Sequence, residues 1–150
     1  MEDPVQLAMN RFDVPKGHET FIFAVPALYV AEADGSLSFK ESVSIVVNTL
    51  RSNLVVFRSR EGRKEFQNFI NRKVRGLLQQ RSLPDVEMLT EAINTLLYQY
   101  PLNEAKAIRQ AMYDTCVKVA KASGPLFREK VSAEEKRMLD SIFTDIPEPQ

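Results

Sequence analysis

Two stretches of this chain, about ninety residues apart, carry the same pattern and predict helices that meet at sharp corners. The first runs from Val30-Ala-Glu-Ala-Asp-Gly35 to Ser38-Phe-Lys-Glu41, and the second runs from Val119-Ala-Lys-Ala-Ser-Gly124 to Ser132-Ala-Glu-Glu135. In each stretch the glycine supplies the left-handed backbone position that commonly ends a helix. A Ser-x-x-Glu capping box then opens the next helix, because the serine oxygen accepts from the glutamate amide while the glutamate reaches back. Two such corners in one chain predict an internal pseudo-repeat.

The spacing of apolar residues predicts helices along most of the chain. Residues 19–33 are so densely apolar that we expect a largely buried helix, with Pro26 either kinking it or lying in its first turn. Residues 38–54 are expected to form the next helix, although their β-branched residues leave a strand as the competing prediction. Amphipathic helices are also expected after Gly62, from Pro84 as a first helical residue, from Asn103 as an N-cap and after Ser132.

These elements predict an all-α fold, a single compact bundle of six or seven helices. We expect the helical domain to cover residues 18–146. Residues 1–17 hold two prolines and no sustained periodicity, so they are expected to form a peripheral lead segment with one short helical turn. Residues 147–150 include Pro147 and Pro149, and are expected to form a short disordered tail.

The composition of the chain bears on its cellular location and on its binding to nucleic acid or lipid. Its 20 basic and 20 acidic side chains leave no net charge to draw nucleic acid or anionic lipid to the whole chain. The single cysteine, Cys116, excludes an intramolecular disulfide, and the Met-Glu-Asp-Pro start has no secretory signal pattern. The longest apolar run, residues 21–31, is too short to cross a bilayer. We therefore expect a cytoplasmic protein without membrane insertion, which is either soluble or associated with a membrane only through a partner.

The first corner fits half of a calcium-binding loop. Asp34-Gly-Ser-Leu-Ser-Phe-Lys-Glu41 has the aspartate, the glycine, the apolar residue and the closing glutamate of its second half. The first ligand position, however, falls on Val30, which has no side-chain oxygen. This chain therefore does not carry a complete EF-hand loop.

The two corners together resemble the TerB-like domain of tellurite-resistance proteins, over roughly residues 20–146. The resemblance implies a compact helical fold in which the corners come together and group acidic residues that bind a divalent cation, Ca²⁺ or Mg²⁺. By motif position these residues are Asp34, Glu41 and Glu135, while Ser123 replaces the aspartate of the second Asp-Gly pair. The same carboxylates are also explained without an ion, because Glu41 and Glu135 complete capping boxes and Asp34 suits a helix end. Both interpretations stay open.

Basic residues are concentrated in one part of the chain. Residues 51–81 contain nine basic and two acidic side chains, so the segment carries +7 and the remainder carries −7. On a helical wheel, Lys64, Arg72 and Arg75 fall opposite an apolar stripe and form an exposed face. This face is either simply solvated or docks an acidic partner or lipid surface, and it lacks the interleaved aromatic residues of a nucleic-acid platform.

The chain has no recognisable catalytic motif. His18 is the only histidine, Cys116 is expected in the core, and nucleophile, P-loop and dinucleotide-binding signatures are absent from the sequence. We therefore predict a protein that is not an enzyme. The resemblance implies a TerB-like module in a tellurite-resistance or general stress-response assembly, which senses a divalent cation or docks a protein through its acidic corner. The alternative is a metal-independent helical scaffold that binds a protein partner through its apolar or basic surface.

Overall fold

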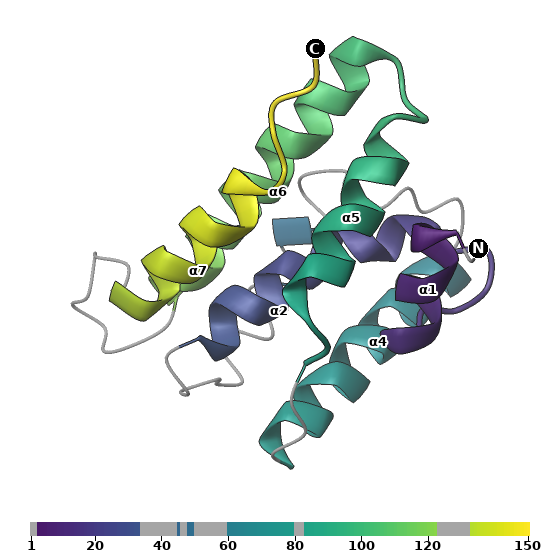
Figure 1. Cartoon of the computed structure of the whole chain (residues 1–150). Coiled ribbons are helices and arrows are strands. Elements are labelled where there is room, and N and C mark those ends of the chain that lie inside the picture. The colour runs from purple at the N-terminus through teal and green to yellow at the C-terminus, as the bar shows by residue number, and fades with distance from the viewer. Residues whose placement is uncertain (1–2, 34–44, 46–47, 50–59, 80–82, 123–132) are drawn as a thin grey trace.

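A computed structural model describes residues 3–33, 45, 48–49, 60–79, 83–122 and 133–150. All regular secondary structure within these residues is helical, which confirms the predicted all-α fold (Figure 1). The elements are α1 (Pro4–Arg11), the 3₁₀ helix η1 (Glu19–Ala24), α2 (Val25–Glu32), α4 (Arg60–Leu78), α5 (Val86–Leu97), α6 (Leu102–Ala122) and α7 (Ala133–Thr144). None of these helices is both long enough and apolar enough to span a bilayer.

The α2 helix lies at the centre of the fold. Residues 21–31 are all buried, because η1 packs against α1 and α5 while α2 packs against α6 and α7 (Figure 1). A helix that is apolar on every side is stable only where neighbours cover every side. Pro26 lies in the first turn of α2, which was one of the two predicted placements. There its missing N–H removes no helical hydrogen bond.

The prediction that residues 1–17 are peripheral is wrong. Val5, Ala8, Met9 and Phe12 of α1 and its C-cap are spaced as one helical face, and all four are buried. This face packs against α5, and the Phe12 ring meets the Tyr29 ring edge-on at a centroid distance of 6.3 Å. The first helix therefore contributes to the common hydrophobic core.

The end of α1 is a Schellman-type cap formed around Asp13. Asp13 has a positive φ of 54°, and the Val14 amide donates to the Met9 carbonyl at 2.9 Å. This is the hydrogen bond that closes such a cap, and the position after the helix end is usually glycine. The turn directs the chain toward η1 and places the Asp13 side chain beside α4.

Two predicted helix starts are wrong by two residues each. The α5 helix begins at Val86 and not at Pro84, because the Asp85 carboxylate accepts from the Glu87 amide at 3.1 Å and makes Asp85 the N-cap. Asn103 is not an N-cap, since α6 already begins at Leu102. In contrast, the predicted apolar stripe of α4 is confirmed for Phe66, Phe69, Ile70 and Val74, which are all buried.

The two corners are largely outside the described residues. The residues outside the described ranges include Asp34, Gly35, Ser38, Glu41 and residues 123–132. The pseudo-repeat therefore stays a prediction. Cys116 is buried in α6, as expected. Residues 147–150, predicted as a disordered tail, have no regular secondary structure and lie beside the corner between α5 and α6.

Candidate functional site

The candidate site is a groove between the second half of α4 and the end of α1. It has a volume of about 590 Å³, and we call it the basic groove. Four cationic side chains and one carboxylate line it: Arg11, Arg72, Lys73, Arg75 and Asp13. Its remaining lining is Phe12, Gly76, Leu77, Gln79, Leu83 and Pro84. The groove thus brings cationic and apolar side chains together.

Local sequence explains why α4 presents arginines to this groove. One side of the helix packs into the core through Phe66, Phe69, Ile70 and Val74. Because the helix has 3.6 residues per turn, Arg72 and Arg75 lie on the opposite side. Both arginines are exposed. Arg75 lies in the last turn of α4, where a cation also interacts favourably with the helix dipole.

Lys73 differs from the two arginines because its charge is already paired. Its Nζ lies 2.9 Å from Asp13 Oδ2 and 5.8 Å from the centre of the Phe69 ring, and only 15% of its side chain is exposed. This pair ties α4 to the cap of α1. By contrast, neither Arg72 nor Arg75 forms an ion pair with a carboxylate in the part of the chain that the structure describes. Their guanidinium groups therefore remain available to a ligand, as does that of the exposed Arg11.

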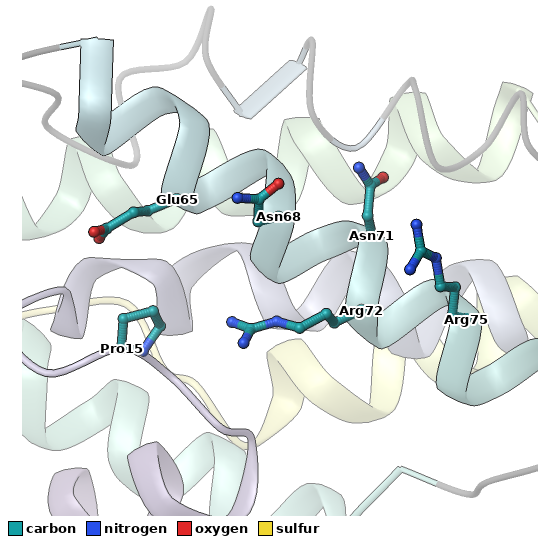
Figure 2. A pocket seen from close by; sticks show the side chains of 6 residues that line it. All are labelled: Pro15, Glu65, Asn68, Asn71, Arg72 and Arg75. Carbon is teal, nitrogen blue, oxygen red and sulfur yellow. The ribbon is translucent and has the colours of Figure 1, made fainter.

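The same two arginines also line a second groove, of about 440 Å³, along α4. Its other lining residues are Pro15, Glu65, Asn68 and Asn71 (Figure 2). In Figure 2 the Arg72 side chain extends toward Pro15, whereas the Arg75 side chain rises beside Asn71. Each asparagine amide offers both hydrogen-bond donors and an acceptor, so this groove is suited to the peptide groups of an extended segment.

His18 pairs with Glu65, one of the residues that line this second groove. Its Nε2 lies 2.5 Å from Glu65 Oε2, and its ring stacks on Phe21 at a centroid distance of 4.7 Å. The single histidine is thus held in place by α4 and by the core. It connects the loop before η1 to the helix that carries the arginines.

Two of the three predicted partner-binding residues lie beside each other in the structure. Arg72 and Arg75 lie together between the two grooves, whereas Lys64 is exposed nearer the start of α4 and lines neither. Sequence reasoning missed Asn68 and Asn71, which the same helical spacing indicates. It also missed Arg11, since only the tertiary packing of α1 brings this residue to α4.

The predicted cation ligands are not brought together within the described residues. Asp34 and Glu41 lie outside them, while Glu135 lies in the first turn of α7 with none of its surface exposed. No group of three or more histidine, cysteine, aspartate or glutamate side chains is placed to hold a metal ion in the described ranges. The cation site formed by Asp34, Glu41 and Glu135 therefore stays a prediction.

Burial raises the pKa values of two side chains, Cys116 and Tyr29. It raises the pKa of the Cys116 thiol well above its ordinary value, so at neutral pH this side chain is a neutral thiol and not a thiolate nucleophile. It also raises the pKa of Tyr29, with smaller contributions from Asp85 and Glu32. The Tyr29 hydroxyl thus stays protonated and donates a hydrogen bond to the Pro84 carbonyl.

Comparisons with protein-family models, with curated proteins and with solved structures find no match to this chain. The two grooves are therefore the features that indicate a function.

Proposed function

We propose that this chain is a non-enzymatic binding module that docks an acidic segment of a protein partner in the basic groove. The observation that carries the proposal is the pair of exposed guanidinium groups, Arg72 and Arg75, shared by two grooves and unpaired with any described carboxylate. Arginine is the side chain best suited to bind carboxylates, because its planar fork makes two parallel hydrogen bonds.

The lining of the basic groove favours a peptide over a polyanion. Half-buried Leu77 and Leu83 lie beside the cations, so a ligand that combines carboxylates with an aliphatic side chain matches both parts of the surface. Nucleic acid would instead require a wider field of cations, and the whole chain has no net charge. The asparagines of the second groove add hydrogen-bonding groups for the backbone of the same segment.

The test compares two charge reversals on the same helix. The probe is a fluorescein-labelled peptide rich in aspartate, glutamate and leucine, and its binding is followed by fluorescence anisotropy. We expect the Arg72→Glu/Arg75→Glu variant to weaken binding at least about tenfold, because a hydrogen bond to a charged group contributes about 1.5–3 kcal/mol. The matched control is Arg63→Glu/Lys64→Glu, which makes the same charge change at exposed positions of α4 that line neither groove.

An equal loss of binding in both variants would contradict docking in the groove, since it would show only a general attraction to positive charge. Stronger binding to anionic lipid vesicles than to the peptide would contradict the proposed class of partner. Circular dichroism of both variants checks that α4 remains folded.

A second candidate function is the cation-sensing role implied by the TerB-like resemblance. One observation favours it: the Glu135 carboxylate is fully buried in α7, which packs against α2, and α2 ends at Glu32 shortly before Asp34. In this proposal Asp34, Glu41 and Glu135 bind Ca²⁺ or Mg²⁺, and the module acts in a cytoplasmic tellurite-resistance or stress-response assembly. Oxygen ligands of this kind are the ones that both ions prefer.

Thermal denaturation with added CaCl₂ or MgCl₂ separates this candidate from the first. An ion that binds only the folded state raises its stability by mass action, by about 2.7 kcal/mol at one hundred times the Kd. We expect this rise to disappear in the Asp34→Asn/Glu41→Gln variant. A melting temperature that does not change at millimolar ion would reject the cation role and leave the binding module unaffected.

A further inference from the structure

The corner between α5 and α6 carries the most conspicuous apolar surface in the described part of the chain. Tyr98 is 91% exposed and Leu102 is 45% exposed, and these are its two exposed large hydrophobic side chains. They line a groove of about 540 Å³, which we call the corner groove. Its lining also includes Asn94, Leu97, Tyr100, Ala105 and residues 147–150.

The segment that follows α7 is tightly held up to Ile146. Arg109 donates from Nε to the Ile146 carbonyl at 2.7 Å and from Nη2 to the Phe143 carbonyl at 3.2 Å. Asn94 donates to the Asp145 carbonyl at 2.8 Å, and the Ile146 side chain is fully buried. These contacts fix the position from which residues 147–150 extend beside the corner groove (Figure 1).

Beyond Ile146 the attachment is much weaker. Glu148 lies 3.9 Å from Arg109 Nη1, but 79% of its side chain is exposed, and an ion pair of this kind contributes about 0–1 kcal/mol. Pro147 is exposed and Pro149 is half-buried. Residues 147–150 therefore line the corner groove but leave the Tyr98 ring almost completely uncovered.

The prolines of residues 147–150 and the tyrosines that line the corner groove match a known mode of peptide recognition. Proline residues separated by one residue favour an extended backbone with fixed φ, so such a segment loses little conformational entropy on binding. Aromatic rings cover the flat faces of prolines, and Tyr98 and Tyr100 supply two of them here. Burial raises the pKa of Tyr100, with smaller contributions from Glu19 and Glu104, so its hydroxyl stays protonated and can donate to a peptide carbonyl.

From this arrangement we propose that the corner groove docks an extended, proline-containing segment of a protein partner, which takes the place of residues 147–150. The chain's own Pro-Glu-Pro segment is a weakly held occupant that shows which chemistry the groove accepts. Arg109 provides the charge for an acidic residue between the two prolines, as it does for Glu148. The proposal concerns surfaces of α5 and α6, and is independent of the basic groove on α4.

Residues 147–150 occupy the corner groove and therefore compete with a free peptide that binds there. A flexible segment attached beside its own site acts at an effective concentration in the millimolar range, and competes with any free peptide. The removal of residues 147–150 therefore increases the affinity of the corner groove for a free proline-containing peptide. It costs the fold little, since these residues add no fully buried side chain.

The experiment uses a fluorescein-labelled peptide Ile-Pro-Glu-Pro-Gln and a control peptide in which alanine replaces both prolines. Binding is measured by fluorescence anisotropy to the complete chain and to a variant that lacks residues 147–150. We expect the proline peptide to bind the shortened variant about two- to sixfold more tightly than the complete chain, because an occupant held by about 0–1 kcal/mol competes by that factor. In the shortened variant, Tyr98→Ala should abolish this binding, whereas Gln99→Ala, an exposed neighbour that does not line the groove, should leave it unchanged.

Three results would overturn the proposal. The first is that the proline peptide does not bind the shortened variant. The second is equal binding of the alanine peptide, which would make the groove a general apolar patch. The third is a dimer of the shortened variant in analytical ultracentrifugation that excludes the peptide, which would make a second copy of the chain the occupant.

A measurement on the complete chain keeps the proposal testable if the shortened variant does not fold. With millimolar proline peptide, we expect amide chemical-shift changes in NMR spectra at Tyr98, Tyr100 and Leu102. The alanine peptide should leave these resonances unchanged, and shift changes confined to α4 would contradict the corner groove as the binding site.

Discussion

Replacing Phe12 with alanine is expected to destabilise the whole fold, although the residue belongs to a segment that looks peripheral in the sequence. Phe12 has no exposed surface, and its ring packs edge-on against Tyr29, which is itself buried at the centre of the molecule. Truncation of a fully buried phenylalanine costs about 3–5 kcal/mol, from lost transfer free energy and from the cavity left behind. A domain of this size typically has a free energy of unfolding of about 5–15 kcal/mol, so the loss is a large part of the total.

Urea denaturation followed by circular dichroism measures this change directly. At a few degrees of melting temperature per kcal/mol for a chain of this length, the midpoint of thermal unfolding should fall by roughly 10 °C or more. The matched control is Arg11→Ala, which changes the exposed neighbour and should alter the free energy of unfolding by less than about 0.5 kcal/mol. A Phe12→Ala variant that loses no more stability than the control would show that α1 is not part of the cooperative core, and would refute the packing argument.

Two further predictions concern the cap of α5 and the behaviour at high pH. Asp85→Ala should lower the free energy of unfolding by about 1 kcal/mol, because it removes the acceptor for the Glu87 amide, whereas Asp85→Asn should keep most of the cap. Urea midpoints of both variants test this, and equal losses would mean that the charge of Asp85, and not its cap, stabilises the helix. The raised pKa of Tyr29 implies that the unfolded chain releases the phenol proton first, so stability should decline as pH rises above about 10. The slope of the free energy of unfolding should not exceed about 1.4 kcal/mol per pH unit for this group. Denaturation at pH 9–11 in a Cys116→Ala background, which removes the buried thiol, should show a flatter dependence for Tyr29→Phe; an unchanged slope would contradict the assignment.

Local patterns in the sequence were sufficient for most of the helices. The stripe on α4 recurs every three or four residues, so the exposure of Arg72 and Arg75 follows from helix geometry. The central position of α2 follows from a run of apolar residues that no surface helix carries. The predicted start of α5 is two residues too early, because the side-chain oxygen of Asp85 competes with the intrinsic preference of Pro84 for a first turn.

The candidate site was less predictable than the fold, because it depends on contacts between distant parts of the chain. Lys73 pairs with Asp13 across sixty positions, and nothing near either residue in the sequence indicates its partner. The same packing carries Arg11 to the groove and leaves Lys64 outside it. Four apolar residues of α1 do follow a helical spacing, so its burial was detectable in principle, but the prolines on both sides obscured the pattern.

The central position of α2 determines how the two grooves are linked energetically. Helices from both halves of the sequence cover α2 and η1, so no one of them can detach without exposing apolar surface at the centre. The basic groove and the corner groove therefore belong to one cooperative unit, and a ligand in either groove stabilises the whole molecule against unfolding. Stabilisation against unfolding alone does not couple the two sites. A ligand in one groove therefore leaves the affinity of the other groove unchanged, unless it also shifts the molecule between two folded arrangements.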